Sequence, residues 1–261
     1  DGHLSLVKES QKKGYFSLVS IYVNPLQFSE KNDFKNYPRT LKKDLELLKK
    51  HNVDLIFLPK KKFADTSFSV DIGKIGNKLC GVDRPGHFSG VALVILKFLN
   101  LIHPHFITLG QKDYQQVLVI KKLIKDFFFK TKLIIVPTFR EKNGLALSSR
   151  NRLISDKKKH LTKMIFETLN TIAFDLENFG LKESKINRFR QKFLKLGFEK
   201  VNYIEVLKEE SLSELDNTPS KCRIFISITI DGVRLIDNIA VRKKLVKQKG
   251  LIKTEGKKVN S

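Results

Sequence analysis

Hydrophobic and polar positions alternate in blocks along the first half of the chain, and the blocks predict strands and helices in turn. Apolar runs rich in β-branched residues at 17–23 and 53–58 are each closed by a proline and are typical of buried strands. Between them, leucines spaced along 41–48 fall on one face of a helix that Thr40 can cap. A strand, a helix and a second strand in this order predict a parallel pair joined by a right-handed crossover.

The same order then recurs. It consists of an apolar helix at 91–101, a strand at 106–109, a helix at 113–127 that Asp113 can cap, and a strand at 133–136. This alternation predicts an α/β fold with a doubly wound parallel sheet. Ligands of such sheets bind beyond the carboxyl ends of the strands, so we expect the segments 24–28, 110–113 and 137–150 to meet in one cleft.

The pattern changes after Arg150. Two helices at 155–176 and 182–196 precede strand-like runs at 201–207, 223–230 and 234–241. Helices followed by strands predict a smaller α+β domain. The predicted domains are 1–138 and 139–246, and the polar, lysine-rich residues 247–261 are expected to form a flexible basic tail.

The formal charge is +23, from 50 Lys and Arg against 27 Asp and Glu, which raises nucleic-acid binding as a function. The lysines are spread along the chain, however, as on solvated helix faces, so we expect no nucleic-acid partner. No apolar stretch approaches the roughly 20 residues that span a bilayer, and no membrane partner is expected. Cys80 and Cys222 lie far apart without metal-type spacing, which fits reduced thiols in the cytoplasm.

Two segments carry chemistry suited to phosphate. Residues 110–113, Gly-Gln-Lys-Asp, lie where a predicted strand ends and a helix begins, so backbone N–H groups and the helix dipole attract phosphate and Lys112 adds a positive charge. Residues 147–150, Leu-Ser-Ser-Arg, offer two hydroxyls and a guanidinium that can grip a polyphosphate. Taken alone, the first is also consistent with a capped turn and the second with an interdomain turn.

Two further segments are suited to a small substrate. In the loop 84–90, Pro and two Gly residues precede an apolar helix, and His87 could either line an anion site with Arg84 or satisfy a buried carbonyl. Asn24 and Gln27 follow a buried strand, and their amides could bind a hydroxyl and a carboxylate. The histidines lack zinc-ligand spacing, and no dinucleotide, P-loop or nucleophile-elbow motif occurs, which argues against those chemistries.

Seven strings in this order closely resemble the pantothenate synthetases, also called pantoate-β-alanine ligases, from residue 1 to about Val241. They are GHLSLV (2–7), VNPLQF (23–28), YPRT (37–40), RPGHF (84–88), KDYQQ (112–116), GLALSSRN (144–151) and RLIDN (234–238). Seven collinear strings are far more specific than any one of them.

The resemblance implies a Rossmann-like nucleotidyltransferase domain of the His-x-Gly-His superfamily that binds nucleotide and pantoate, covered by a small C-terminal lid domain. It implies a cytoplasmic homodimer that uses ATP with Mg²⁺, pantoate and β-alanine. Pantoate would attack the α-phosphate to form pantoyl adenylate and pyrophosphate, and β-alanine would then release AMP to give pantothenate. The alternatives are another nucleotidyltransferase of this superfamily, against which the neutral Gln27 and Gln116 argue, and a basic nucleic-acid-binding protein.

Site residues carry over from the resemblance by position. The implied catalytic residues are His3, which would stabilise charge as pyrophosphate leaves, and Lys112, which would contact the same phosphates. The implied ATP-binding residues are Asp1, Gly2, His3, Gly110, Gln111, Lys112, Asp113, Phe139, Leu147, Ser148, Ser149 and Arg150. The implied pantoate- and β-alanine-binding residues are Gln27, Gln116, Asn24, Tyr37 and Arg84. No protein-held metal is implied, because Mg²⁺ would arrive with ATP.

The chain departs from the family pattern in three places. The first His of His-x-Gly-His and the Met-Gly-Ala-Leu before it would precede Asp1, so we expect the first strand and half of the phosphate-binding turn to be missing. Gln111 replaces the usual Glu, and Ser89 stands where a bulkier or basic residue is common. We expect weakened nucleotide contacts from the last two, and no other reaction.

Overall fold

The computed structural model describes residues 2–12, 14–28, 34–35, 37, 39–180, 182–216, 221–242, 245–248 and 251–254. Contacts along the chain divide it into two compact units, Asp1–Thr138 and Phe139–Ser261. The division falls between Thr138 and Phe139, so the change of sequence pattern after Arg150 lies within the second unit. In the part of the chain that is described, no helix has the length and apolar character needed to cross a membrane.

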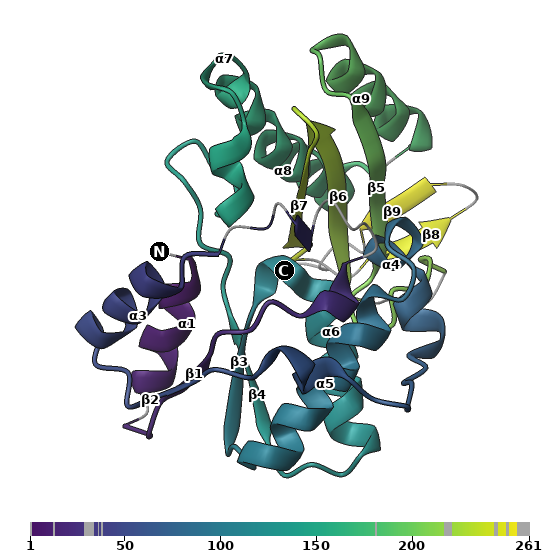
Figure 1. The fold of residues 1–261 in the computed structure, drawn as a ribbon. Helices are drawn as coiled ribbons and strands as arrows, with labels where there is room; N and C mark the ends of the chain where they lie inside the picture. The colour runs from purple at the N-terminus through teal and green to yellow at the C-terminus, as the bar shows by residue number, and fades with distance from the viewer. Residues whose placement is uncertain are drawn as a thin grey trace. The chain divides into compact units, whose positions relative to one another are not determined.

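The first unit is built from parallel strand pairs and helices (Figure 1). Strand β1 (Leu18–Ser20) pairs in parallel with β2 (Leu55–Phe57), and β3 (Phe106–Gly110) pairs in parallel with β4 (Lys132–Val136). The helices are α1 (Gly2–Gln11), α3 (Leu41–Lys50), α4 (Cys80–Asp83), α5 (His87–Ile102) and α6 (Tyr114–Asp126). The predicted α/β class and both parallel crossovers are confirmed, and the described strands form two separate two-stranded ladders.

Helix caps differ from the sequence prediction. Thr40 and Asp113 do occupy the positions before α3 and α6, but neither side chain makes a capping hydrogen bond. Their ψ angles are 42° and 53°, outside the extended conformation from which an N-cap side chain reaches the first helical turn. The Thr40 hydroxyl instead bonds the Asp44 carboxylate, with both distances at 3.2 Å. At Asp113, a 3-10 turn of residues Gln111–Asp113 joins β3 to α6.

Helix α5 supplies much of the core of the first unit. Its sequence is apolar on nearly all sides, and residues from Phe88 to Val94 together with Leu99 are mostly buried. Such a helix is stable only inside a protein, because each buried apolar side chain contributes roughly 1.5–3 kcal/mol. It packs against α6, whose Val117 and Ile120 are almost fully buried.

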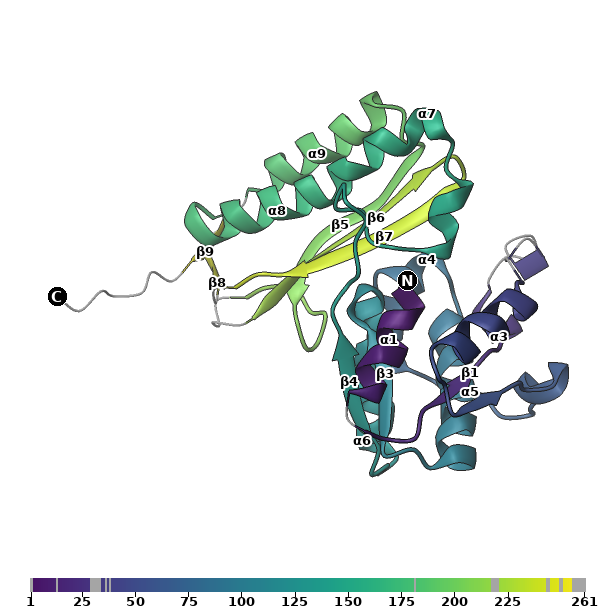
Figure 2. The same cartoon turned by 90° about the vertical axis from the view of Figure 1, so that its left-hand side faces the viewer.

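The second unit is a three-stranded antiparallel sheet in the order β5 (Lys200–Lys208), β6 (Cys222–Ile230), β7 (Val233–Ala240). Helices α8 (Lys163–Asn178) and α9 (Glu183–Lys195) cover one face of it (Figure 2). The predicted helix at 155–176 is interrupted: α7 (Asp156–Lys159) and a 3-10 turn (His160–Thr162) precede α8. The α+β class of this unit is confirmed.

An exposed ionic cluster ties α7 to the turn between β6 and β7. The Asp231 carboxylate lies 2.9 Å from the Lys158 ammonium and accepts bonds from the backbone N–H and hydroxyl of Ser155, at 2.9 and 2.8 Å. These partners, Lys158 first, lower the pKa of Asp231 to about 2. The cluster therefore holds the start of the helical segment against the sheet. Asp231 itself lies in the turn with a positive φ of 52°.

The C-terminal segment differs from the expected flexible tail in its first part. Strands β8 (Leu245–Gln248) and β9 (Leu251–Thr254) pair as an antiparallel hairpin. Each strand has only four residues, so its apolar alternation is short. The many lysines of the segment hide that alternation, and the composition as a whole therefore suggests a tail. Residues 255–261 lie outside the described part of the chain.

Candidate active site

The predicted phosphate-binding segment lies at the carboxyl end of β3. Gly110 is the last residue of the strand, Gln111–Asp113 form the 3-10 turn, and α6 begins at Tyr114. Lys112 is half-buried in that turn. The N–H groups of a helix start have no helical partner and carry the positive end of the dipole, so a cation beside them suits a phosphate group.

Asn24 fixes the shape of the loop 24–28 through two hydrogen bonds of its side chain. Its side chain is 4% exposed, its Nδ2 donates to the carbonyl of Gly90 at 3.0 Å, and its Oδ1 accepts from the N–H of Leu26 at 3.0 Å. Both polar atoms are therefore engaged inside the protein, where an unsatisfied amide would be costly. From the sequence we expect Asn24 in the substrate pocket. In the structure, its side chain shapes the 3-10 turn Pro25–Gln27.

Arg84 and His87 clamp the same loop from its other end. The Gln27 carbonyl accepts a bond from Nη2 of Arg84 at 2.7 Å and faces Nδ1 of His87 at 2.6 Å. Of the two roles that the sequence left open for His87, the structure shows the bond to a carbonyl. The side chain of Gln27 is half-buried and makes no hydrogen bond to any residue that the structure describes, so it can serve a ligand.

Two adjacent glutamines on α6 have different surroundings. Gln115 is 4% exposed; its Nε2 donates to the carbonyls of Ile75 and Lys78, at 2.9 and 2.7 Å, and its Oε1 accepts from the N–H of Cys80 at 3.0 Å. Gln116 is half-buried and, within the described chain, has no such bonds. The sequence string alone cannot separate them, and the structure assigns Gln115 to the fold.

The aromatic residues beside this loop pack on one another. The Phe28 ring lies 5.4 Å from that of Tyr37 and 5.3 Å from that of Phe34, both edge to face. Arg39 donates to the carbonyl of Phe34 at 2.8 Å and to that of Tyr37 at 3.2 Å. Tyr37 is therefore held next to Phe28, the residue that follows Gln27.

His3 lies in the first turn of α1 and is exposed, next to the buried Leu4. Its partner in the predicted ATP set, Gly2, is the first residue of the helix, and Asp1 lies outside the described residues. An exposed histidine at a helix start can meet an anion without a desolvation penalty.

The second unit carries the other predicted phosphate segment in a folded-back loop. Arg140 and Ala146 form an antiparallel bridge, and the N–H of Leu147 donates to the Phe139 carbonyl at 2.9 Å. Ser148 caps the following 3-10 turn, with Oγ accepting from the Arg150 N–H at 3.2 Å. This bond uses the Ser148 oxygen as acceptor, so its O–H proton stays available, and Ser149 is exposed.

Within the ranges that the structure describes, no three His, Cys, Asp or Glu side chains gather in a way that could hold a metal ion.

Comparisons with known proteins agree with the order of these segments. A family model described as pantoate-beta-alanine ligase matches residues 1–240. The pantothenate synthetase of Caldicellulosiruptor bescii is 36% identical over 249 residues, covering 94% of this chain and 88% of that protein. That of Bacillus pumilus is 38% identical over 242 residues, covering 92% and 84%.

Solved structures agree as well. Pantothenate synthetase from Thermus thermophilus has a TM-score of 0.81 at 30% identity, over 92% of this chain and 88% of that one. The pantoate-beta-alanine ligase of Francisella tularensis, complexed with beta-gamma ATP and beta-alanine, has a TM-score of 0.77 at 38% identity, over 92% and 85%. The chain therefore belongs to the pantoate-β-alanine ligase family of ATP-dependent ligases.

Proposed function

We propose that this chain joins pantoate to β-alanine through a pantoyl adenylate. The pantoate carboxylate attacks the α-phosphate of ATP and pyrophosphate leaves; the β-alanine amine then attacks the acyl carbon, and AMP leaves as pantothenate forms. The observation that carries the proposal is the family match over residues 1–240. It favours this reaction over another nucleotidyltransferase and over nucleic-acid binding.

The proposed phosphate contacts explain how the first step is accelerated. Negative charge grows on pyrophosphate as it leaves, so a cation held in place before the reaction stabilises the transition state more than the substrate. Lys112 and His3 take this role, and Mg²⁺ enters as the ATP complex. Ser148, Ser149 and Arg150 also contact the phosphates.

The remaining nucleotide contacts are made mainly by backbone. Phe139 lies near the adenine through its main chain, Gly110 and Asp113 lie near the ribose, and Gly2, Gln111 and Leu147 border the nucleotide.

The acid substrate is held by neutral amides. Gln27 and Gln116 hydrogen-bond the hydroxyl and carboxylate of pantoate. Neutral amides leave the carboxylate nucleophilic, because they do not pair with its charge as a bonded cation would. Tyr37 and Arg84 border the pocket, and Arg84 also fixes the Gln27 backbone. Asn24 supports Gln27 from inside the fold and is not assigned a substrate contact.

Isotope exchange between pyrophosphate and ATP, measured on the purified protein, tests this function. We expect exchange that requires pantoate and does not require β-alanine, because the first step is reversible before the amine arrives. Exchange without pantoate, or none in any combination, would contradict the substrate assignment. Formation of pantothenate on adding β-alanine completes the test.

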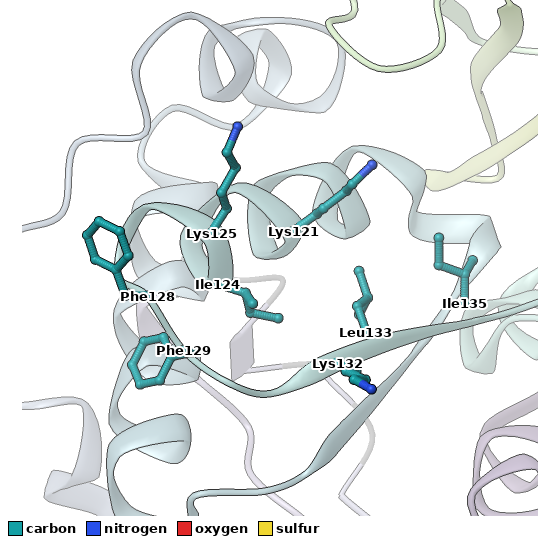
Figure 3. A pocket seen from close by; sticks show the side chains of 8 residues that line it. All are labelled: Lys121, Ile124, Lys125, Phe128, Phe129, Lys132, Leu133 and Ile135. Carbon is teal, nitrogen blue, oxygen red and sulfur yellow. The ribbon is translucent and has the colours of Figure 1, made fainter.

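We also propose that the enzyme is a cytoplasmic homodimer, as the resemblance implies, with the β4 edge as its interface. A groove of about 640 Å³ lies there (Figure 3), lined by Lys121, Ile124, Lys125, Phe128, Phe129, Lys132, Leu133 and Ile135. Phe128 is 89% exposed and Ile135 41%, so the groove, which three lysines also line, presents exposed apolar side chains that a second copy would cover.

Light scattering on the purified protein should give a dimer mass, and Phe128→Asn should shift it toward the monomer. Phe128 has a φ of 57°, where asparagine is better tolerated, so the variant should fold. A monomer in the unmodified protein, or an unchanged dimer in a variant that also carries Ile135→Lys, would contradict the proposed interface.

A further inference from the structure

The loop that carries Ser148–Arg150 is anchored by a buried ion pair that the sequence does not single out. Nη1 of Arg140 lies 2.6 Å from Oδ2 of Asp237 on β7, and Nη2 lies 2.9 Å from Oδ1. The side chains are 19% and 1% exposed, respectively. Two parallel bonds of this kind fix the orientation of the guanidinium as well as its position.

Arg140 also fixes the tip of the loop. Its Nη1 donates to the Gly144 carbonyl at 2.9 Å, and its guanidinium lies 3.9 Å from the centre of the Phe166 ring on α8. Gly144 has a φ of 89°, and a Cβ there would meet Phe166 at 2.6 Å. One side chain thus joins the start of the loop, its tip, a helix and the sheet.

A second anchor holds the far end of the loop. Asn151 is 8% exposed; its Nδ2 donates to Oε1 of Glu141 at 2.7 Å and to the Ala146 carbonyl at 3.2 Å. Its N–H donates to the Ser148 carbonyl at 3.1 Å. Residues 148–150 therefore lie between two fixed points, Ala146 and Asn151.

Asp237 is itself held in place by the sheet. Its Oδ1 accepts from the Asn238 N–H at 2.7 Å, and the Asn238 side chain accepts from Nη1 of Arg223 at 2.6 Å. Arg223, with its side chain 3% exposed, lies 2.6 Å from Glu209. The carboxylate that receives Arg140 therefore belongs to a connected buried network, which gives a rigid base for the loop.

We infer that the Arg140–Asp237 pair positions Ser148, Ser149 and Arg150 for the ATP polyphosphate. The inference rests on the proposed phosphate contacts of those three residues. A loop that is already ordered binds its ligand without a further loss of conformational entropy, and its donors meet the transition state in the correct place. Arg140 acts through the loop and is a positioning residue.

The test compares two variants of different severity. Arg140→Lys keeps the positive charge and removes the bidentate hydrogen bond to Asp237. Phe166→Leu removes only the aromatic ring that lies under the guanidinium. We expect Arg140→Lys to raise the KM for ATP by about tenfold or more and Phe166→Leu by a smaller factor, while the KM for pantoate changes less than about twofold.

A control separates positioning from stability. Asp175→Asn breaks the pair between Asp175 on α8 and Lys185 on α9, which lies in the same unit and does not touch the loop. It should lower the midpoint of urea unfolding and leave the KM for ATP unchanged. If Asp175→Asn raises that KM as much as Arg140→Lys does, the effect is one of general stability and the inference is wrong.

Arg150→Ala separates this inference from the proposed function. If it leaves the KM for ATP unchanged, the loop does not bind phosphate and the proposed contacts are wrong. If it raises that KM while the folded Arg140→Lys and Phe166→Leu variants leave it within twofold of normal, the contacts stand and the positioning role is overturned.

Discussion

Replacing Lys112 with alanine is expected to lower kcat/KM for pantoate-dependent exchange by about 10²- to 10³-fold. Lys112 lies half-buried in the turn between β3 and α6, where the helix dipole already favours an anion. Removing its charge takes away stabilisation that grows as pyrophosphate leaves, so kcat should fall more than the KM for ATP rises. Initial rates of exchange over a range of ATP concentrations measure both.

Lys122→Ala is the matched control for this variant. Lys122 lies on α6, the helix that follows the Lys112 turn; its side chain is 57% exposed, and it pairs with Asp126 on the surface. Such pairs contribute about 1 kcal/mol or less, so exchange should be nearly unchanged. A Lys112→Ala enzyme with more than a third of normal exchange would remove Lys112 from the catalytic set.

Gly90→Ala is expected to damage pantoate binding through the backbone. A Cβ at this position would lie 2.4 Å from the Leu26 carbonyl oxygen and 2.6 Å from its carbon, so the turn that carries Gln27 must shift. The same glycine accepts the bond from Asn24. We expect the KM for pantoate to rise by about 10- to 100-fold and stability to fall by about 1–3 kcal/mol.

Ala92→Gly separates the two effects of that variant. Ala92 is fully buried on the same helix, and glycine there costs roughly 1 kcal/mol of helix stability plus a small cavity, but it adds no atom that could collide with the Gln27 turn. Its urea midpoint should fall while its KM for pantoate stays normal. An equal rise of the pantoate KM in both variants would show that lost stability explains the effect of Gly90→Ala.

Most helices and strands could be predicted from the sequence because their hydrophobic period is long enough to identify them. The α5 region is apolar over more than three turns, and β6 is a run of β-branched residues. The short elements were missed for the opposite reason. The four-residue strands of the β8–β9 hairpin carry too little periodicity to stand out from a lysine-rich background.

Within the candidate site, the sequence could name residues but not their partners. Asn24 and Gln27 look alike as amides after a strand, yet one is buried with both polar atoms engaged and the other keeps its side chain for a ligand. Gln115 and Gln116 divide in the same way. Neighbours on a turn or helix point in different directions, and the backbone path sets which of them faces the interior.

The sequence by itself determined the α/β and α+β character of the two halves and, through seven ordered strings, the family and its ligase chemistry. Only the tertiary structure decided which polar residues support the site. Arg140 and Asp237 are 97 positions apart, and His87 is 60 from the carbonyl it contacts. No local pattern records such pairs, because they form only when packing brings distant segments together and leaves buried polar groups to satisfy one another.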